Sequence, residues 1–107
     1  VYVRDIVSAN LVAETVFRTK NAKRFFAFNI GTSVETSILE LHQLLGRVAQ
    51  YSKPPRFESA KPGEQLRSVL SYEVFKRETG WSPQYSLEQG LHETFSWFQS
   101  PPTKVPA

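Results

Sequence analysis

Apolar residues recur at intervals of three and four in three segments of the chain, and this spacing constrains the fold more than any other feature. Side chains at that interval share one face of an α-helix, so each segment predicts a helix with one apolar face. The three segments cover residues 5–20, the stretch after Ser37 and the stretch after Ser86. Their apolar positions are Ile6, Ala9, Ala13, Val16 and Phe17, then Ile38, Leu41, Leu45 and Val48, then Leu87, Leu91, Phe95 and Phe98.

Polar residues mark where these helices begin. Ser37 and Glu40 form a Ser-x-x-Glu capping box, in which each residue satisfies a backbone N–H of the other. Ser86 and Gln89 have the same spacing. Asp5 suits the start of the first helix, because a carboxylate is favoured at the positive end of the helix dipole.

Proline and glycine indicate where helices end. The pair Pro54-Pro55 prevents the second helix from continuing, since proline lacks a backbone N–H and clashes with the preceding turn. A fourth, shorter helix is predicted from Ser71 to about Thr79, with Gly80 at its C-terminal end.

Short strands are expected at residues 1–3 and 24–31, with briefer ones at 56–59 and 68–71. These strands are too few for a complete parallel sheet. The predicted fold class is therefore α/β in the loose sense of an α+β lobe: a small, mostly helical lobe with a few short strands. Residues 100–107 read SPPTKVPA and predict a disordered, proline-rich tail.

Composition excludes several classes of function. The chain of 107 residues is enough for one modest domain. It has no cysteine, which excludes disulfides, thiolate metal sites and a cysteine nucleophile. His42 and His92 lie far apart, so no metal site is expected. The net charge of +3 comes from scattered basic residues, which disfavours nucleic acid as a partner.

No membrane partner is expected either, because no apolar run approaches the roughly 20 residues that span a bilayer. No signal peptide is visible, and a cytoplasmic location is the default expectation. The chain has no methionine and starts with VYVRD, which leads us to expect a chain whose beginning is absent.

Tyr72 and Lys76 have the Tyr-x-x-x-Lys spacing of short-chain dehydrogenases, which places both side chains on one helical face. In those enzymes the cation lowers the pKa of the tyrosine for acid–base chemistry. Here no glycine-rich loop accompanies the pair to hold a pyrophosphate. Ordinary helix-face residues are the favoured interpretation, and no catalytic residue is assigned.

Four stretches, taken in order, carry a family resemblance. They read VYVRDIVSAN, FNIGTSVETSILEL, KPGEQLRSVLS and GWSPQYSLEQGLHETFSWF. Together they resemble the C-terminal part of the extended short-chain dehydrogenase/reductase family, the NAD-dependent nucleotide-sugar epimerases and dehydratases, similar to UDP-glucose 4-epimerase. The resemblance covers roughly residues 1–99.

This resemblance implies that residues 1–99 form a nucleotide-sugar-binding lobe. In the family, a preceding Rossmann domain carries the NAD-binding loop and the catalytic Tyr-x-x-x-Lys. The chain alone is therefore expected to bind no cofactor, to hold no metal and to be inactive. Its implied partners are a nucleotide diphosphate sugar, bound weakly, the missing Rossmann domain, and further copies in a homo-oligomer. Whether the parent enzyme is an epimerase or a dehydratase stays open, as does a non-catalytic binding or protein-interaction module derived from the same fold.

The resemblance also implies which residues bind the substrate. The family pattern is Arg-Pro-Gly-Glu/Asp, where the basic residue contacts the nucleotide diphosphate and the acid accepts a hydrogen bond from a ribose hydroxyl. By position these roles fall to Lys61 and Glu64. Lys61 replaces the arginine and lacks its planar fork for two parallel hydrogen bonds to phosphate. Two further departures are Ser71, where the family usually has aspartate, and Thr79, where it usually has leucine.

Overall fold

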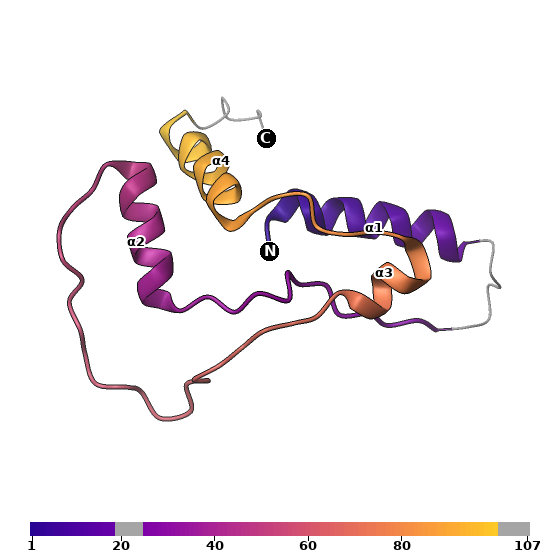
Figure 1. The fold of residues 1–107 in the computed structure, drawn as a ribbon, viewed down its shortest axis with the longest axis horizontal. Helices are drawn as coiled ribbons and strands as arrows, with labels where there is room; N and C mark the ends of the chain where they lie inside the picture. Colours follow the sequence, from indigo (N-terminus) through magenta and orange to yellow (C-terminus); the bar gives the residue numbers. More distant parts are fainter. Residues whose placement is uncertain (19–24, 101–107) are drawn as a thin grey trace, which may run out of the picture. The chain divides into compact units, whose positions relative to one another are not determined.

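The computed structural model describes residues 1–18 and 25–100, and these parts hold four α-helices (Figure 1). The helices are α1 (Val3–Phe17), α2 (Ile38–Ala49), α3 (Glu73–Thr79) and α4 (Leu87–Gln99). The chain divides into two compact units. The first unit consists of Val1–Glu35 and Gln65–Ser86 and contains α1 and α3. The second unit consists of Thr36–Glu64 and the residues from Leu87 onward, and it contains α2 and α4.

Helix α1 presents the predicted face to the core of the first unit. Ala9 is buried, and the four other predicted positions are half-buried. The helix begins two residues before Asp5, with Tyr2 as its N-cap residue. Asp5 is therefore not a cap: it lies in the first turn and is almost completely buried. The last two residues of the predicted helix, 19 and 20, lie outside the described residues.

The core of the first unit is small and aromatic. Ala9, Phe75 and Trp81 are its buried apolar residues, and the rings of Phe75 and Trp81 meet edge-on with centroids 5.6 Å apart. Phe28 packs against Phe75 at 5.3 Å and against Phe17 at 5.2 Å. These ring contacts join α1, α3 and the segment after residue 25 into one packed unit.

Helix α3 ends as predicted, at Thr79, with Gly80 in the left-handed conformation at φ 78°. It begins at Glu73, and the hydroxyl of Ser71 accepts a hydrogen bond from the Glu73 N–H. The Thr79 hydroxyl donates to the Phe75 carbonyl at 2.7 Å and accepts from the Trp81 N–H at 3.1 Å. Thr79 thus fixes the C-terminal end of the helix by two hydrogen bonds, which an apolar residue at this position could not make.

The predicted strands are wrong for the residues that the structure describes, which contain helices and irregular segments only. Val3 already belongs to α1. Residues 31–35 run beside residues 67–70 in opposite directions, but the recorded backbone bond between them is that of Ser33 N–H to Leu70 C=O, at 3.1 Å. A strand needs a continued ladder of such bonds with a partner. The described fold is therefore helical, and the few short strands of the predicted α+β lobe are corrected.

In the second unit, α2 begins with the predicted capping box. The Ser37 hydroxyl accepts from the Glu40 N–H at 3.1 Å, and the Glu40 carboxylate accepts from the Ser37 N–H at 2.7 Å. The Ser37 hydroxyl also donates to the Glu40 carboxylate, at 2.8 Å. The two bonds that this carboxylate accepts lower the pKa of Glu40, the one from the Ser37 backbone N–H more than the one from the hydroxyl. The local sequence thus specifies this helix start without tertiary contacts.

Helix α2 packs against α4, but incompletely. Leu41 and Val48 of the predicted apolar face are half-buried, whereas Ile38 is 80% exposed and Leu45 is 41% exposed, so those two positions are wrong. Helix α4 begins directly after Ser86 as predicted. Leu91 and Phe95 of its predicted apolar face are half-buried, whereas Leu87 and Phe98 are 39% and 70% exposed, so those two positions are wrong. No residue of α2 is fully buried, because within its unit this helix is covered on one side alone.

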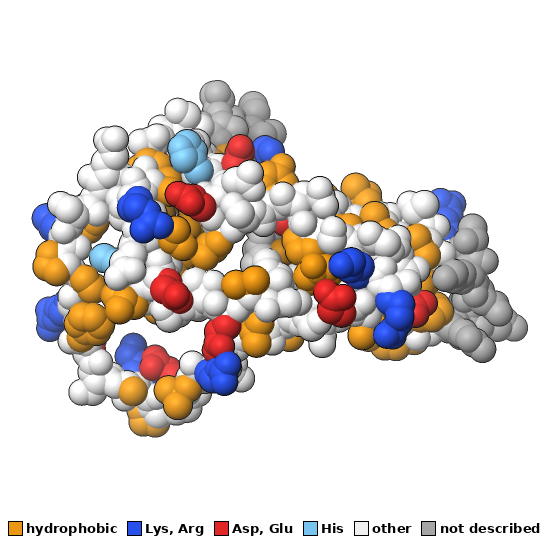
Figure 2. Space-filling view, viewed as in Figure 1, with side chains coloured by type: hydrophobic (Ala, Val, Ile, Leu, Met, Phe, Trp, Pro, Cys, Tyr) orange, Lys and Arg blue, Asp and Glu red, His pale blue; other side chains and the backbone are white. Residues whose placement is uncertain are grey.

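Large apolar side chains reach the surface in both units (Figure 2). On α1, Val3, Val7 and Leu11 recur at four-residue spacing with exposures of 64%, 53% and 62%. They form a second apolar face of this helix, distinct from the face on the core.

No helix in the described parts is long and apolar enough to cross a membrane. The predicted disordered tail covers residues 100–107, and of these only Ser100 is among the described residues.

Candidate functional site

Lys61 and Glu64 lie at the two ends of a tight turn in the second unit. The Glu64 N–H donates to the Lys61 carbonyl at 3.3 Å. Between them, Pro62 precedes Gly63, whose φ of 85° is a left-handed conformation that glycine adopts without steric cost. Proline followed by a left-handed glycine is typical of a type II turn. The sequence therefore specifies this turn locally.

The carboxylate of Glu64 closes the turn a second time. One of its oxygens accepts a hydrogen bond from the Lys61 N–H at 3.3 Å. This bond holds the carboxylate against the backbone, while both side chains remain exposed. A carboxylate has four lone-pair sites, so Glu64 keeps acceptor capacity for a hydroxyl. The turn thus presents a flexible point charge and a fixed acceptor, three residues apart.

A bidentate ion pair near this turn in the sequence was not foreseen. Arg67 donates from Nε and Nη2 to the two carboxylate oxygens of Glu35, at 2.8 and 2.6 Å. The hydrogen bond to Glu35 raises the pKa of Arg67. The two residues are 32 positions apart, and no periodicity or motif connects them. Only the antiparallel approach of residues 31–35 and 67–70 could have indicated the pair.

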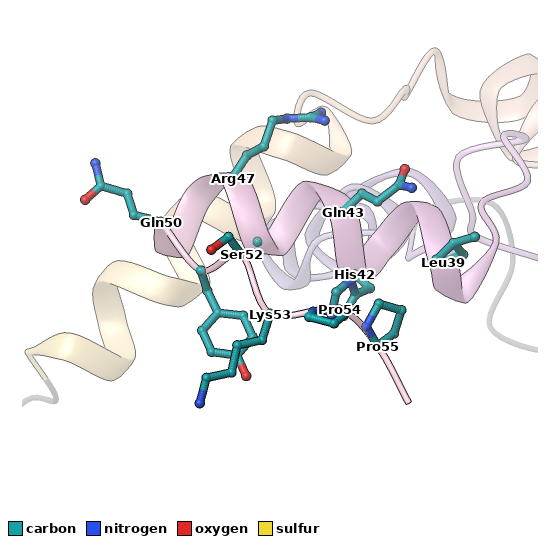
Figure 3. Close-up of a pocket in the computed structure, with 11 residues that line it drawn as sticks. Leu39, His42, Gln43, Arg47, Gln50, Ser52, Lys53, Pro54 and Pro55 are labelled. Atoms are coloured by element: carbon teal, nitrogen blue, oxygen red, sulfur yellow. The ribbon is translucent and has the colours of Figure 1, made fainter. Parts of the chain in front are cut away.

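A hollow of about 550 Å³ lies between α2 and the segment that follows it (Figure 3). Gln50 ends α2 in the left-handed conformation, and the Tyr51 N–H donates to the Gly46 carbonyl at 2.8 Å. The chain then returns along the helix, and a Cβ on Gly46 would meet the Tyr51 carbonyl at 2.8 Å. The lining residues are Leu39, His42, Gln43, Gly46, Arg47, Gln50, Tyr51, Ser52, Lys53, Pro54 and Pro55.

The polar groups of this hollow do not converge on one point. Arg47 and Lys53 extend in opposite directions from the helix and the returning segment (Figure 3). A ligand site usually combines apolar walls with a few polar groups that converge on the ligand. Neither Lys61 nor Glu64 lines this hollow.

Tyr72 and Lys76 lie on one helical face, as their spacing predicts. The Lys76 ammonium lies over the Tyr72 ring, 5.8 Å from its centroid, and the ring meets Trp81 edge-on at 6.0 Å. This is a cation–π contact at the edge of the core, which supports a packing role. In the described parts of the chain, no three His, Asp or Glu residues are placed to hold a metal ion.

Comparison with known proteins gives a consistent result. The chain is 34% identical over 73 residues to UDP-glucose 4-epimerase of Mycolicibacterium smegmatis, covering 68% of this chain and 23% of that protein. It is 30% identical over 101 residues to GDP-L-fucose synthase of Escherichia coli, covering 91% of this chain and 31% of that protein. No protein-family model matches the chain.

A solved structure extends the likeness to the fold. A crystal structure of UDP-glucose 4-epimerase from Thermotoga maritima, determined with UDP-glucose, matches with a TM-score of 0.77 and 36% identity. The match covers 92% of this chain and 30% of that one. The chain thus spans less than a third of the length of these relatives. It belongs to the extended short-chain dehydrogenase/reductase family of nucleotide-sugar epimerases and their relatives.

Proposed function

We propose that this chain is the C-terminal, substrate-binding part of an NAD-dependent nucleotide-sugar epimerase or dehydratase. In this proposal it contacts the nucleoside diphosphate of the substrate. The remaining two-thirds of a family member's length would hold NAD and carry out the chemistry, and the chain alone is inactive. The likeness over 92% of the chain to a structure determined with UDP-glucose supports this assignment.

The observation that carries the proposal is the closed turn from Lys61 to Glu64. It presents two exposed groups of opposite charge, the Lys61 side chain as a cation for the diphosphate and the held carboxylate of Glu64 as an acceptor for a ribose hydroxyl. The relatives include enzymes named for UDP-, GDP- and dTDP-sugars, which share a diphosphate and a sugar hydroxyl beside it. The turn would bind this shared part of the substrate, and it would not select for a particular base or sugar.

The expected affinity of the chain alone is low. A hydrogen bond to a charged group contributes roughly 1.5–3 kcal/mol when well formed. Two such contacts, less the cost of immobilising the ligand, correspond to a dissociation constant on the order of millimolar.

The proposal is tested by titrating the isotope-labelled chain with UDP and following backbone NMR signals. We expect the signals of residues 59–68 to move, and Lys61→Gln to weaken binding. Lys61→Arg should tighten binding, because a guanidinium can grip phosphate through two parallel hydrogen bonds. The matched control is Lys53→Gln, which removes an exposed lysine outside the turn and should leave binding unchanged. Equal effects of Lys61→Gln and Lys53→Gln would contradict the assignment.

A further inference from the structure

The hollow between α2 and the segment that follows it is built by contacts within one short stretch of the second unit. The Gln50 N–H donates to the Arg47 carbonyl at 3.3 Å, and the Tyr51 N–H donates to the Gly46 carbonyl at 2.8 Å. This pair of bonds around a left-handed residue is the Schellman type of helix end. The returning segment then contains Pro54-Pro55, whose rings fix the backbone φ. The hollow is therefore formed before any ligand arrives.

The walls of the hollow are apolar and open to solvent. Leu39 is 43% exposed and Tyr51 is 53% exposed, and the proline pair lies beside them. Grooves with aromatic walls are a common way of binding extended peptides. The lining follows α2 from Leu39 to Gln50, which corresponds to about 16 Å along the helix axis. An extended peptide of about five residues has the same length.

The charged groups of the hollow are all positive. Arg47 and Lys53 line it and are exposed, and neither side chain has a hydrogen bond or an ion pair within the described residues. None of the described residues that line the hollow is acidic. Cations without a neighbouring carboxylate attract acidic groups of a partner.

The positions of the two cations distinguish an extended ligand from a small one. Arg47 and Lys53 extend in opposite directions from the two walls (Figure 3). A single phosphate or carboxylate needs donors that converge on it. A peptide with an acidic residue at each end can instead contact the two cations separately, while its centre covers the apolar walls.

We propose that this hollow is a docking site for an extended segment of a partner protein, about five residues long, in which acidic residues flank an apolar centre. The apolar centre contacts Tyr51 and Pro54, and the acidic ends pair with Arg47 and Lys53. The inference goes beyond the proposed function and does not depend on it, because neither Lys61 nor Glu64 lines the hollow.

The test titrates the isotope-labelled chain with a blocked peptide of sequence Glu-Leu-Pro-Leu-Glu and with the same peptide in which glutamine replaces both glutamates. We expect the acidic peptide to move the NMR signals of residues 39–55 and the neutral one to bind more weakly. Arg47→Gln and Lys53→Gln should each weaken binding of the acidic peptide by about threefold, as expected for an exposed ion pair. Tyr51→Ser should weaken the binding of both peptides, because it removes an apolar wall.

The matched control is Lys61→Gln, which removes the same charge from an exposed position of the same unit outside the hollow. It should leave peptide binding unchanged while weakening UDP binding, and Lys53→Gln should do the reverse. If both substitutions weaken peptide binding equally, net charge is the cause and the inference is wrong.

Three other outcomes would also overturn the inference. The first is that the acidic peptide leaves the signals of residues 39–55 unmoved in a folded chain, a result that does not affect the UDP titration. The second is that UDP displaces the peptide, which would make the hollow a small-anion site. The third is that Tyr51→Ser abolishes self-association of the chain in sedimentation without peptide, which would make the hollow an interface between copies.

Discussion

The carboxylate of Asp5 accepts a hydrogen bond from the backbone N–H of Gln84, at 2.9 Å, across 79 residues of sequence. Its second oxygen accepts from the Tyr85 N–H at 3.3 Å. One turn further along α1, the Ser8 hydroxyl accepts from the Trp81 indole N–H at 2.9 Å. The first two turns of α1 thus hold the loop that follows α3.

Replacing Asp5 should therefore destabilise the first unit. Asp5→Ala leaves two backbone N–H groups without their acceptor, and we expect the free energy of unfolding to fall by about 2 kcal/mol. Chemical denaturation measures this. Glu14→Ala, an exposed change on the same helix, is the control and should stay within about 0.5 kcal/mol of the parent chain. Equal losses in the two variants would show that the Asp5 contacts contribute little.

Gly31 should not tolerate a side chain, because of the space around it. A Cβ there would meet the Leu70 carbonyl oxygen at 2.3 Å. Gly31→Ala must push residues 31–35 away from residues 67–70, at a cost of about 1–3 kcal/mol. We expect faster hydrogen exchange at the Ser33 N–H, which bonds Leu70. Asn29→Ala, an exposed change in the same segment, should leave that exchange rate unaltered.

The start of α2 should weaken in acid. The hydrogen bonds from Ser37 lower the pKa of Glu40 in the folded chain. A lowered folded-state pKa means that the contribution is complete above the ordinary glutamate pKa and is lost as the pH falls through the lower folded-state value. The Ser37 amide signal should follow this titration. Glu40→Gln removes the ionisable group, so a titration of the same size in that variant would contradict the explanation.

The second apolar face of α1 should promote self-association. Val3, Val7 and Leu11 are all more than half exposed at four-residue spacing. Exposed apolar faces tend to find partners. Sedimentation at increasing concentration should show association, and Val7→Gln with Leu11→Gln should reduce it. Val34→Gln, which replaces a valine that is 68% exposed and outside the helices, should not. A parent chain that stays monomeric at high concentration would contradict the prediction.

The sequence by itself determined the local features of this protein. The capping box of Ser37 and Glu40, the left-handed Gly80 after α3 and the Pro62-Gly63 turn all involve residues within a few positions of one another. Their hydrogen bonds and backbone angles depend on neighbouring residues, so a sequence pattern predicts them. The core face of α1 was predicted because the spacing of its apolar residues is also a local property of the sequence.

Only the tertiary structure decided the contacts between distant segments. Residues 24–31 have the aromatic composition of a strand, but strand formation depends on a partner that supplies a continued ladder, and no local pattern provides that information. Asp5 was predicted to begin a helix, yet the fold buries it against Gln84 and Tyr85. The pairing of Arg67 with Glu35 likewise arises from the approach of two segments, because an ion pair between residues 32 positions apart has no signature in sequence spacing.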